Sequence, residues 1–297
     1  MRGPCPTAIS IMKQLIHFTK MQGAGNDYIY LDRMDPTLPP LPIDPSELAR
    51  RMSPRHTSVG ADGLVLILPS DKADARMRMF NADGSEGAMC GNAIRCVGKY
   101  LHDEGYFQGL KLTVETKGGI RHLDLHPGID GEIDSATVDM GQATLSPTDI
   151  PLSCDLPLID APVSALGATY HITALSVGNP HAVIFTDDPQ ALDLPPIGSA
   201  LEHHPLFPQR VNIEFVRITD PRTLETRVWE RGSGETLACG TGACASVVAA
   251  VLLGHCPADT PITVRMKGGS LTVVCTSDLR LSMTGDAVRV YDGIYDV

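Results

Sequence analysis

Two cysteines, Cys90 and Cys239, occupy matching contexts in the two halves of this 297-residue chain. The first lies in RMFNADGSEGAMCGNAIRC and the second in RVWERGSGETLACGTGACA, so each follows a polar run and precedes a glycine. A helical pattern follows each of them, and a thiol at a helix start meets free backbone N–H groups and the positive end of the helix dipole. That placement predicts a lowered thiol pKa. Two such thiols in one cleft could serve a substrate from opposite faces, one removing a proton and the other donating one.

Further matches at nearly the same offset indicate that the chain is duplicated. The two cysteines are 239 − 90 = 149 residues apart, and TVETKGG from Thr113 recurs as TVRMKGG from Thr263, 150 residues later. GNDYIY from Gly25 and GNPHAVIF from Gly178 share Gly-Asn before an apolar run, at an offset of 153. Three matches in the same order predict two related domains.

The composition is that of a globular enzyme with a small-molecule substrate. Hydrophobic residues make up 43% of the chain, charged residues 20%, and the net charge is −11, which argues against a nucleic-acid or anionic-membrane partner. No apolar run reaches the roughly 18 residues of a membrane helix, and the start, MRGPCPTAISIMKQLIHF, lacks the pattern of a signal peptide. Eight cysteines without a C-x-x-C pair favour reduced thiols and a cytoplasmic location.

Helical periodicity gives three clear elements that would position the chemistry. The segment after Cys90 has apolar residues at helical spacing, Ile94, Val97 and Leu101, and Gly105 is a plausible stop. The segment after Cys239 is apolar almost all round, as expected of a helix at a domain centre. DPSELARRM predicts a further helix that begins near Asp44 or Ser46.

The remaining pattern is mostly strands. Residues 14–32 predict two strands around a glycine-rich turn, and further strands are expected in GLVLILPS, RMRMFN, LKLTVET, RHLDL, HITALSVGNPHAVIF, VNIEFVRITD and TLETRVWE. Residues 136–160 are expected to hold the crossing between halves. The last strand, AVRVYDGIY, has no evident counterpart ending the first half and is expected to return to the first domain.

The predicted fold class is therefore α/β (α+β), with two pseudo-symmetric domains, each a mixed sheet wrapped round a central helix. The expected amino-terminal domain comprises residues 12–135 plus 286–297 and carries Cys90. The expected carboxy-terminal domain comprises residues 136–285 and carries Cys239.

Other interpretations of these residues are weaker. The remaining cysteines are expected to be packing residues, since a lone cysteine is usually a small buried hydrophobe; they are Cys5, Cys96, Cys154, Cys244, Cys256 and Cys275. Zinc is disfavoured because the spacings are C-x5-C and C-x4-C without a second close pair. GAGND and GTGA lack the Walker pattern and the dinucleotide fingerprint.

Several segments together resemble diaminopimelate epimerases: TKMQGAGNDY, FNADGSEGAMCGNAIRC, SVGNPHAV, RVN and ERGSGETLACGTGA. The resemblance runs from about residue 16 to the carboxy terminus. It implies two α/β halves with an active site between them, and interconversion of LL- and meso-diaminopimelate in lysine and peptidoglycan biosynthesis. It also implies that no cofactor or metal is needed and that the enzyme is a homodimer.

The resemblance also assigns residues. Cys90 and Cys239 match the two catalytic bases. His181 and Glu230 match residues that tune the thiols, and Tyr291 matches a position at dimer contacts. The substrate-binding positions that it implies are Asn26, Asn81, Gly91, Asn92, Asn179, Asn212, Glu230, Arg231, Gly240 and Thr241. Of these, Glu230 and Arg231 match the pair that reads the distal amino-acid end of the substrate, where a guanidinium can grip a carboxylate with two hydrogen bonds.

Two rival functions remain open from the sequence. One is another cofactor-independent racemase on the same fold, acting on proline, hydroxyproline or histidine, which would keep both cysteines and change the distal contacts. GNPH and ERGSGET favour diaminopimelate over these substrates. The other rival is a non-catalytic ligand-binding or thiol redox protein. The absence of C-x-x-C argues against dithiol exchange.

Overall fold

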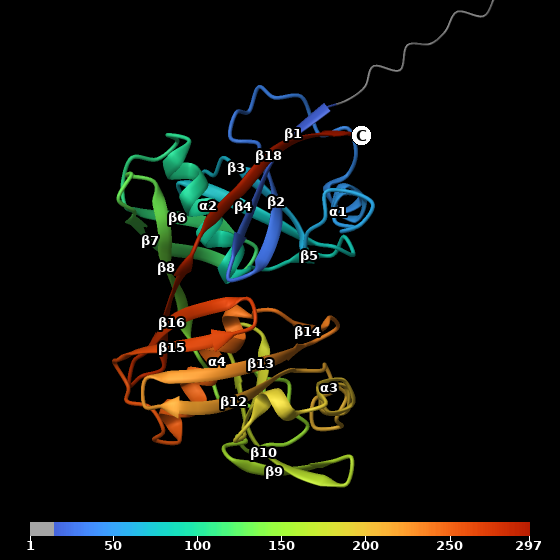
Figure 1. Ribbon diagram of the computed structural model, residues 1–297, viewed down its shortest axis with the longest axis vertical. Coiled ribbons are helices and arrows are strands. Elements are labelled where there is room, and N and C mark those ends of the chain that lie inside the picture. Colours follow the sequence, from blue (N-terminus) through green and yellow to red (C-terminus); the bar gives the residue numbers. More distant parts are fainter. Residues whose placement is uncertain (1–14) are drawn as a thin grey trace, which may run out of the picture.

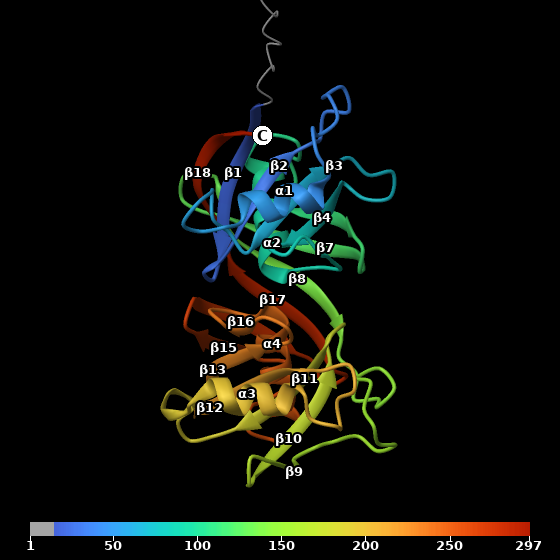
Figure 2. The ribbon, with the colours of Figure 1, turned by 90° about the vertical axis from the view of Figure 1, so that its right-hand side faces the viewer.

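The computed structural model describes residues 15–297, which form two lobes of similar construction joined by a narrow waist (Figures 1 and 2). The strands of the upper lobe in Figure 1 are β1 (Leu15–Gly23), β2 (Asn26–Asp32), β3 (Gly63–Leu68), β4 (Ala75–Asn81), β5 (Glu86–Gly87), β6 (Lys111–Thr116), β7 (Gly119–Pro127), β8 (Ile133–Gln142) and β18 (Val288–Asp296). Its helices are α1 (Pro45–Met52) and α2 (Gly91–Asp103).

The lower lobe repeats this list of elements. Its strands are β9 (Ala161–Ala165), β10 (Ala168–Ser176), β11 (Pro180–Phe185), β12 (Asn212–Asp220), β13 (Thr223–Glu230), β14 (Gly234–Thr236), β15 (Pro261–Met266), β16 (Gly269–Cys275) and β17 (Arg280–Asp286). Its helices are α3 (Leu194–Glu202) and α4 (Gly240–Leu252), with a short 3-10 turn at Pro189–Ala191.

Strand pairing confirms the predicted duplication. In the upper lobe β1 pairs antiparallel with β2, β2 pairs parallel with β3, and β3 pairs antiparallel with β4. In the lower lobe β10, β11, β12 and β13 follow the same sequence of antiparallel, parallel and antiparallel pairings. The parallel pair β4–β6 likewise corresponds to β13–β15. The fold is thus a mixed α+β fold with two pseudo-symmetric halves.

Each half wraps its sheet around one central helix, as predicted. Ile94, Val97 and Leu101 of α2 are buried in the main core. Helix α4 is buried over most of its length, in keeping with its apolar sequence. Both helices belong to one continuous core, because β8 and β17 pair with each other and carry core residues between the lobes. Helix α1 begins after an Asp44 cap, within the predicted range, and covers a separate smaller core.

The two halves exchange their outermost strands. β18 follows β17 but crosses the waist and pairs antiparallel with β1, so the last strand returns to the first lobe as expected. β9 follows β8 and pairs antiparallel with β10 of the lower lobe. The last strand therefore does have a counterpart, and the expectation that it had none is wrong. The sequence pattern does not reveal this counterpart, because β9 has only five residues and follows a long irregular segment.

The crossing between halves is more regular than the sequence indicates. It is made by β8 and β17, which run side by side in Figure 2, whereas residues 143–160 lie beyond it. The predicted domain boundaries, 135/136 and 285/286, fall within β8 and near the end of β17. Four of the cysteines expected to pack are buried: Cys96, Cys244, Cys256 and Cys275. Cys154 is partly exposed on a loop and is not a core residue, which corrects that expectation.

Cys5, the expected start at Met12 and the expectation of no signal peptide fall outside the described residues. Within residues 15–297, no helix is both long and apolar enough to cross a membrane.

Candidate active site

Cys90 and Cys239 are the amino-terminal caps of the two central helices, and their backbones are nearly identical. Cys90 has φ −134° and ψ 119°, and Cys239 has φ −131° and ψ 113°. Each sulfur accepts a hydrogen bond from the backbone N–H three residues on, at 3.5 Å from Ala93 and 3.3 Å from Gly242. The duplicated sequence thus produces a duplicated cap, in which the sulfur takes the place of the usual capping oxygen.

The two helix starts approach each other at the waist, beside Met283 of β17. A β-carbon at Gly91 would lie 2.5 Å from the Met283 methyl, and one at Gly240 would lie 3.2 Å from the same side chain. The β-carbon at Gly240 would also lie 3.6 Å from Asn92 Oδ1 of the other helix. Glycine after each cysteine therefore allows the two helix starts to come close.

Burial, rather than the helix start, dominates the acidity of the two thiols. Removal from water raises the pKa of Cys90, although the backbone N–H groups of Ala93 and Asn92 oppose this change. Burial also raises the pKa of Cys239 well above its usual value, and the carboxylates of Glu230 and Glu214 add to the effect. The predicted lowering of both thiol pKa values is therefore wrong, because the sequence pattern does not reveal how strongly removal from water opposes ionisation of the two thiols.

Glu230 acts on both thiols, so it lies at the junction of the two halves. Its charge raises the pKa of Cys90 and of Cys239. Burial in turn raises the pKa of Glu230 itself, while a 2.5 Å hydrogen bond from the Thr236 hydroxyl opposes that change. A partly buried carboxyl group whose charge acts on both thiols fits the tuning role that the sequence predicts for it.

In the upper lobe, Asn26 links Cys90 to the second residue of its helix. Asn26 Oδ1 lies 3.3 Å from Cys90 Sγ, which donates to it, and accepts a second hydrogen bond from Asn92 Nδ2 at 3.3 Å. Its Nδ2 donates to Asp62 Oδ2 at 2.7 Å, and this fixes the direction of the amide. Asn81 is exposed at the end of β4 and donates to Ser85 Oγ instead.

In the lower lobe, a chain of hydrogen bonds connects a buried histidine to Cys239. His181 Nε2 lies 3.0 Å from Asn179 Oδ1, and Asn179 Nδ2 donates to Thr241 Oγ1 at 3.2 Å. The Thr241 hydroxyl lies 3.4 Å from Cys239 Sγ. The other ring nitrogen of His181, Nδ1, lies 2.7 Å from Glu214 Oε1. Three residues predicted from the sequence are thus brought together with Cys239.

Asn212 and Arg231 form the next layer of the candidate site. Asn212 Nδ2 donates to the Pro180 carbonyl at 2.8 Å, and its Oδ1 accepts from the Arg231 backbone N–H at 2.9 Å. The Arg231 guanidinium is exposed, with Nη1 3.2 Å from the Gln209 carbonyl. Asn212 therefore anchors the turn that presents Glu230 and Arg231, and the guanidinium keeps donors for another partner.

Tyr291 lies on β18, the last strand of the chain, in the upper lobe. Its side chain is 44% exposed and packs edge-on against Phe18, with ring centroids 6.0 Å apart.

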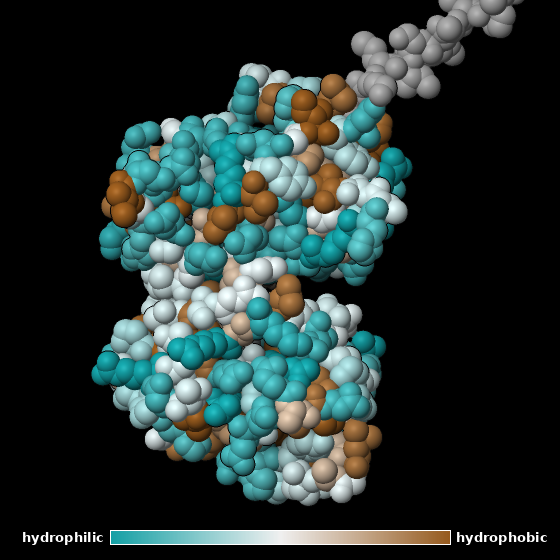
Figure 3. All heavy atoms as spheres, viewed as in Figure 1, coloured by the Kyte–Doolittle hydropathy of each residue, from teal (hydrophilic) through white to brown (hydrophobic). Residues whose placement is uncertain are grey.

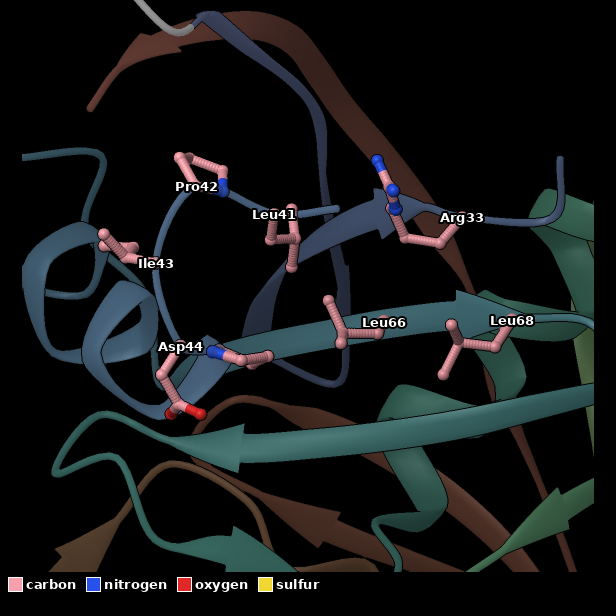
Figure 4. Close-up of a pocket in the computed structure, with 8 residues that line it drawn as sticks. Arg33, Leu41, Pro42, Ile43, Asp44, Leu66 and Leu68 are labelled. Atoms are coloured by element: carbon pink, nitrogen blue, oxygen red, sulfur yellow. The ribbon is translucent and has the colours of Figure 1, made fainter. Parts of the chain in front are cut away.

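The space-filling view in Figure 3 shows the waist between the two lobes. A surface hollow of about 570 Å³ between residues 41–45 and β3 (Figure 4) is lined by none of the candidate site residues.

Comparison with known proteins assigns the family. The sequence profile described as Diaminopimelate epimerase matches residues 18–146 and 173–290. The chain belongs to the diaminopimelate epimerase family. A diaminopimelate epimerase of Desulfovibrio desulfuricans is 49% identical over 292 residues, which are 96% of this chain and 99% of that protein. One of Phocaeicola vulgatus is 50% identical over 284 residues, 95% of this chain and 99% of that protein.

Solved structures show the same fold at much lower identity. A hydroxyproline epimerase from Agrobacterium vitis, with bound trans-4-hydroxy-L-proline, superimposes with a TM-score of 0.68 at 17% identity. The match covers 96% of this chain and 94% of that one. At this identity the likeness supports the fold alone. As a member of the diaminopimelate epimerase family, the protein is an isomerase of the racemase and epimerase class.

Sequence reasoning missed three charged residues that contact the candidate site. Asp62 accepts a hydrogen bond from Asn26, and Glu214 is hydrogen-bonded to His181. Arg95 lies one helical turn after Gly91 and has no solvent exposure. A signal was present for the last two, because Glu214 interrupts an apolar strand and Arg95 interrupts a buried helix. Charged residues in such positions are rarely buried without a partner or a task.

Proposed function

We propose that the protein interconverts LL- and meso-2,6-diaminopimelate through two cysteine bases, in lysine and peptidoglycan biosynthesis. The observation that carries the proposal is that Cys90 and Cys239 cap equivalent helices of duplicated halves, at starts that meet beside Met283. The names of the relatives, which match almost the full chain, supply the substrate.

The proposed chemistry requires one thiolate and one thiol. The thiolate of one cysteine removes the α-proton from one face of the substrate carbon, and the S–H of the other donates a proton to the opposite face. The roles exchange for the reverse reaction. Helix-start N–H groups around Gly91, Asn92, Gly240 and Thr241 would stabilise the negative charge that builds up during transfer. Both transferred protons reside on sulfur, so no cofactor is needed for this step.

Substrate discrimination would come from the next layer of residues. The exposed Arg231 guanidinium suits the distal carboxylate, and Glu230 suits the distal ammonium group. Asn26, Asn81, Asn179 and Asn212 would complete the polar lining. In this proposal a proline-type substrate lacks the group that Arg231 binds, which separates the main function from the racemase rival.

Isotope exchange tests the function directly. The enzyme is incubated with LL-diaminopimelate in deuterium oxide, and the product is analysed for configuration and for deuterium at the α-carbon. Formation of meso product with one α-deuterium supports the proposal. Binding without exchange, or faster exchange on proline or hydroxyproline than on diaminopimelate, would overturn it.

We further propose that the enzyme is a cytoplasmic homodimer that pairs through β18. That strand leaves apolar side chains exposed, with Val290 at 54%, Ile294 at 58% and Tyr291 at 44%. A monomer would leave these side chains in water. Tyr291→Asp should shift the mass measured by light scattering from dimer to monomer, whereas Leu156→Asp, at an exposed apolar side chain elsewhere, should not. A monomeric parent enzyme would contradict the proposal.

A further inference from the structure

Arg95 is a buried cation whose charge is incompletely balanced. Its side chain has no solvent exposure, and it donates to the Asp286 carbonyl at 3.0 Å and to the Gly91 carbonyl at 3.2 Å. The Nη2 atom has no hydrogen-bond partner in the described part of the chain. Its ion pair with Asp286 is long, at 4.0 Å. Arginine keeps its charge even when burial lowers its pKa, so a net positive charge remains close to the helix start of Cys90.

Glu214 is a buried acid on the corresponding side of the other thiol. It is fully buried, with Oε1 bonded to His181 and Oε2 without a hydrogen-bond partner among residues 15–297. A β-carbon at Gly242 would lie 2.7 Å from Oε1, so the carboxyl group packs directly against the first turn of α4. The N–H of this same Gly242 donates to Cys239 Sγ.

We propose that these two buried charges make Cys90 the more acidic of the two thiols in the empty enzyme, so that it ionises first as pH rises. The cation, Arg95, favours the thiolate of Cys90. The acid, Glu214, keeps Cys239 in its protonated form. Charges within a buried site interact strongly because little water screens them.

The other groups around the two sulfurs also act on them, and Asn26 Oδ1, which accepts the Cys90 S–H, opposes ionisation of that thiol. The charge of Glu230 raises the pKa of both thiols. Tyr28 on β2 contacts Cys90 but is held neutral, because burial raises its pKa well above the usual value.

The pKa directions agree with the geometry. Burial raises the pKa of Cys90, and Arg95 is among the groups that oppose the rise. Burial raises the pKa of Cys239 further, and Glu214 adds to that rise. The inference rests on the proposed function for its meaning: at a given pH, more of the empty enzyme carries its thiolate on Cys90 than on Cys239 and is ready for the isomer whose α-hydrogen faces Cys90. Turnover leaves Cys90 protonated and Cys239 ionised, so the proton must return through solvent before the next cycle.

Alkylation of the substrate-free enzyme tests the order of ionisation. The full chain is pulsed with iodoacetamide at a series of pH values, and modification of Cys90 and Cys239 is quantified on separate peptides by mass spectrometry. Only the thiolate reacts, so the pH at which each cysteine reaches half of its maximal rate reports its ionisation. This midpoint is compared between Cys90 and Cys239, because access to the sulfur changes the rate but not the midpoint. The expected result is a lower midpoint for Cys90. A lower midpoint for Cys239 would overturn the proposal.

Two substitutions assign the cause. Arg95→Met should raise the Cys90 midpoint by about one pH unit, a tenfold change in thiolate fraction, and Glu214→Gln should lower that of Cys239 by a similar amount. Arg95→Lys keeps the charge and should preserve the order. If Arg95→Met does not fold, Arg95→Lys and Glu214→Gln still decide the question. Unchanged midpoints in Arg95→Met and Glu214→Gln would sink the inference.

Matched controls remove a buried charge that does not adjoin a thiol. Lys99→Met deletes the next buried cation of α2, which pairs with Asp103 at 2.7 Å. Glu202→Gln alters a buried acid of the lower lobe, which bonds Trp229 Nε1 at 2.8 Å. Both controls should leave the two midpoints in place. Because no substrate is used, a confirmed order without diaminopimelate turnover would reject the proposed function and leave this inference standing.

Discussion

Asn92 Oδ1 lies 3.6 Å from the position that a β-carbon on Gly240 would occupy, so residues 148 positions apart nearly touch across the waist (240 − 92 = 148). This approach joins the second residue of α2 to the first residue of α4. It depends on the absence of side chains at the two glycines that follow the cysteines. The distance between the two thiols is therefore controlled by these positions as well as by the helices.

Adding a methyl group at either glycine should separate the helix starts. Gly91→Ala places a β-carbon 2.5 Å from the Met283 methyl, and Gly240→Ala places one at 3.2 Å. We expect kcat/KM to fall about tenfold or more for Gly91→Ala and less for Gly240→Ala. Alanine favours helix by about 1 kcal/mol relative to glycine, so loss of helix is not the cause.

Met283→Ala provides the control for this prediction. Shortening Met283 removes the clash, so the double variant Gly91→Ala, Met283→Ala should recover part of the activity lost by Gly91→Ala alone. Steady-state kinetics and thermal unfolding are measured together. Equal activity of Gly91→Ala and the parent enzyme would show that the two helix starts are not held at a critical distance.

Cys90→Ala and Cys239→Ala should each lower epimerisation by several orders of magnitude while the fold is retained. Alanine removes the sulfur that exchanges the proton, but otherwise loses only long hydrogen bonds of 3.3–3.5 Å at each helix cap. Activity is measured by conversion of LL-diaminopimelate, and folding by circular dichroism. Cys154→Ala, at a partly exposed loop cysteine, should behave as the parent. Near-parental turnover in either helix-cap variant rules out the two-base mechanism.

Arg231→Lys should mainly impair binding of the distal end of the substrate. An ammonium group cannot form the two parallel hydrogen bonds of a guanidinium with a carboxylate. Loss of such a charge-assisted contact costs about 1.5–3 kcal/mol, or roughly tenfold to a hundredfold in affinity. The loss on diaminopimelate is compared with the loss on a truncated amino acid that lacks the distal group. Equal losses on both would assign Arg231 to the fold or the thiols instead.

Activity should rise with pH from neutrality to about pH 9. Burial raises the pKa of Cys90 and, more strongly, that of Cys239, so the thiolate base becomes more populated only as pH increases. The acid partner remains protonated over this range because its pKa lies still higher. Glu230→Gln removes a carboxylate that raises both pKa values, and the rising limb of kcat/KM should move to lower pH. A profile that falls from pH 7 to 9 would contradict this assignment.

Periodicity predicted most of the elements that position the site. Cysteine before Gly-Asn and Gly-Thr marked both helix starts, because a cap leaves a local signature followed by apolar spacing. The duplication then predicted that the two starts would be equivalent. In the hydrogen-bonded group around Cys239, Asn179, His181 and Thr241 were anticipated, but Glu214 and the connections were not, since these depend on how β11 and β12 pair.

Features that depend on the burial of side chains in the folded protein could not be predicted from the sequence. Burial of Arg95 and Glu214 follows from packing of the helices between the two sheets, which no local window of sequence describes. The same enclosure reversed the expected change in thiol pKa. Asp62 was missed because its contact with Asn26 joins residues that are 36 positions apart in the sequence. The exchange of β9 was missed because a five-residue strand carries little periodicity.

That exchange also bears on the origin of the chain. Each half ends in a strand that pairs with the first strand of the other half, β9 with β10 and β18 with β1. A single ancestral half would therefore leave one edge of its first strand unpaired, and two copies would complete each other as a strand-swapped dimer. Fusion of two such genes would give the present order of elements without any change in pairing. The two thiols would then descend from one cysteine, used twice at a symmetric interface.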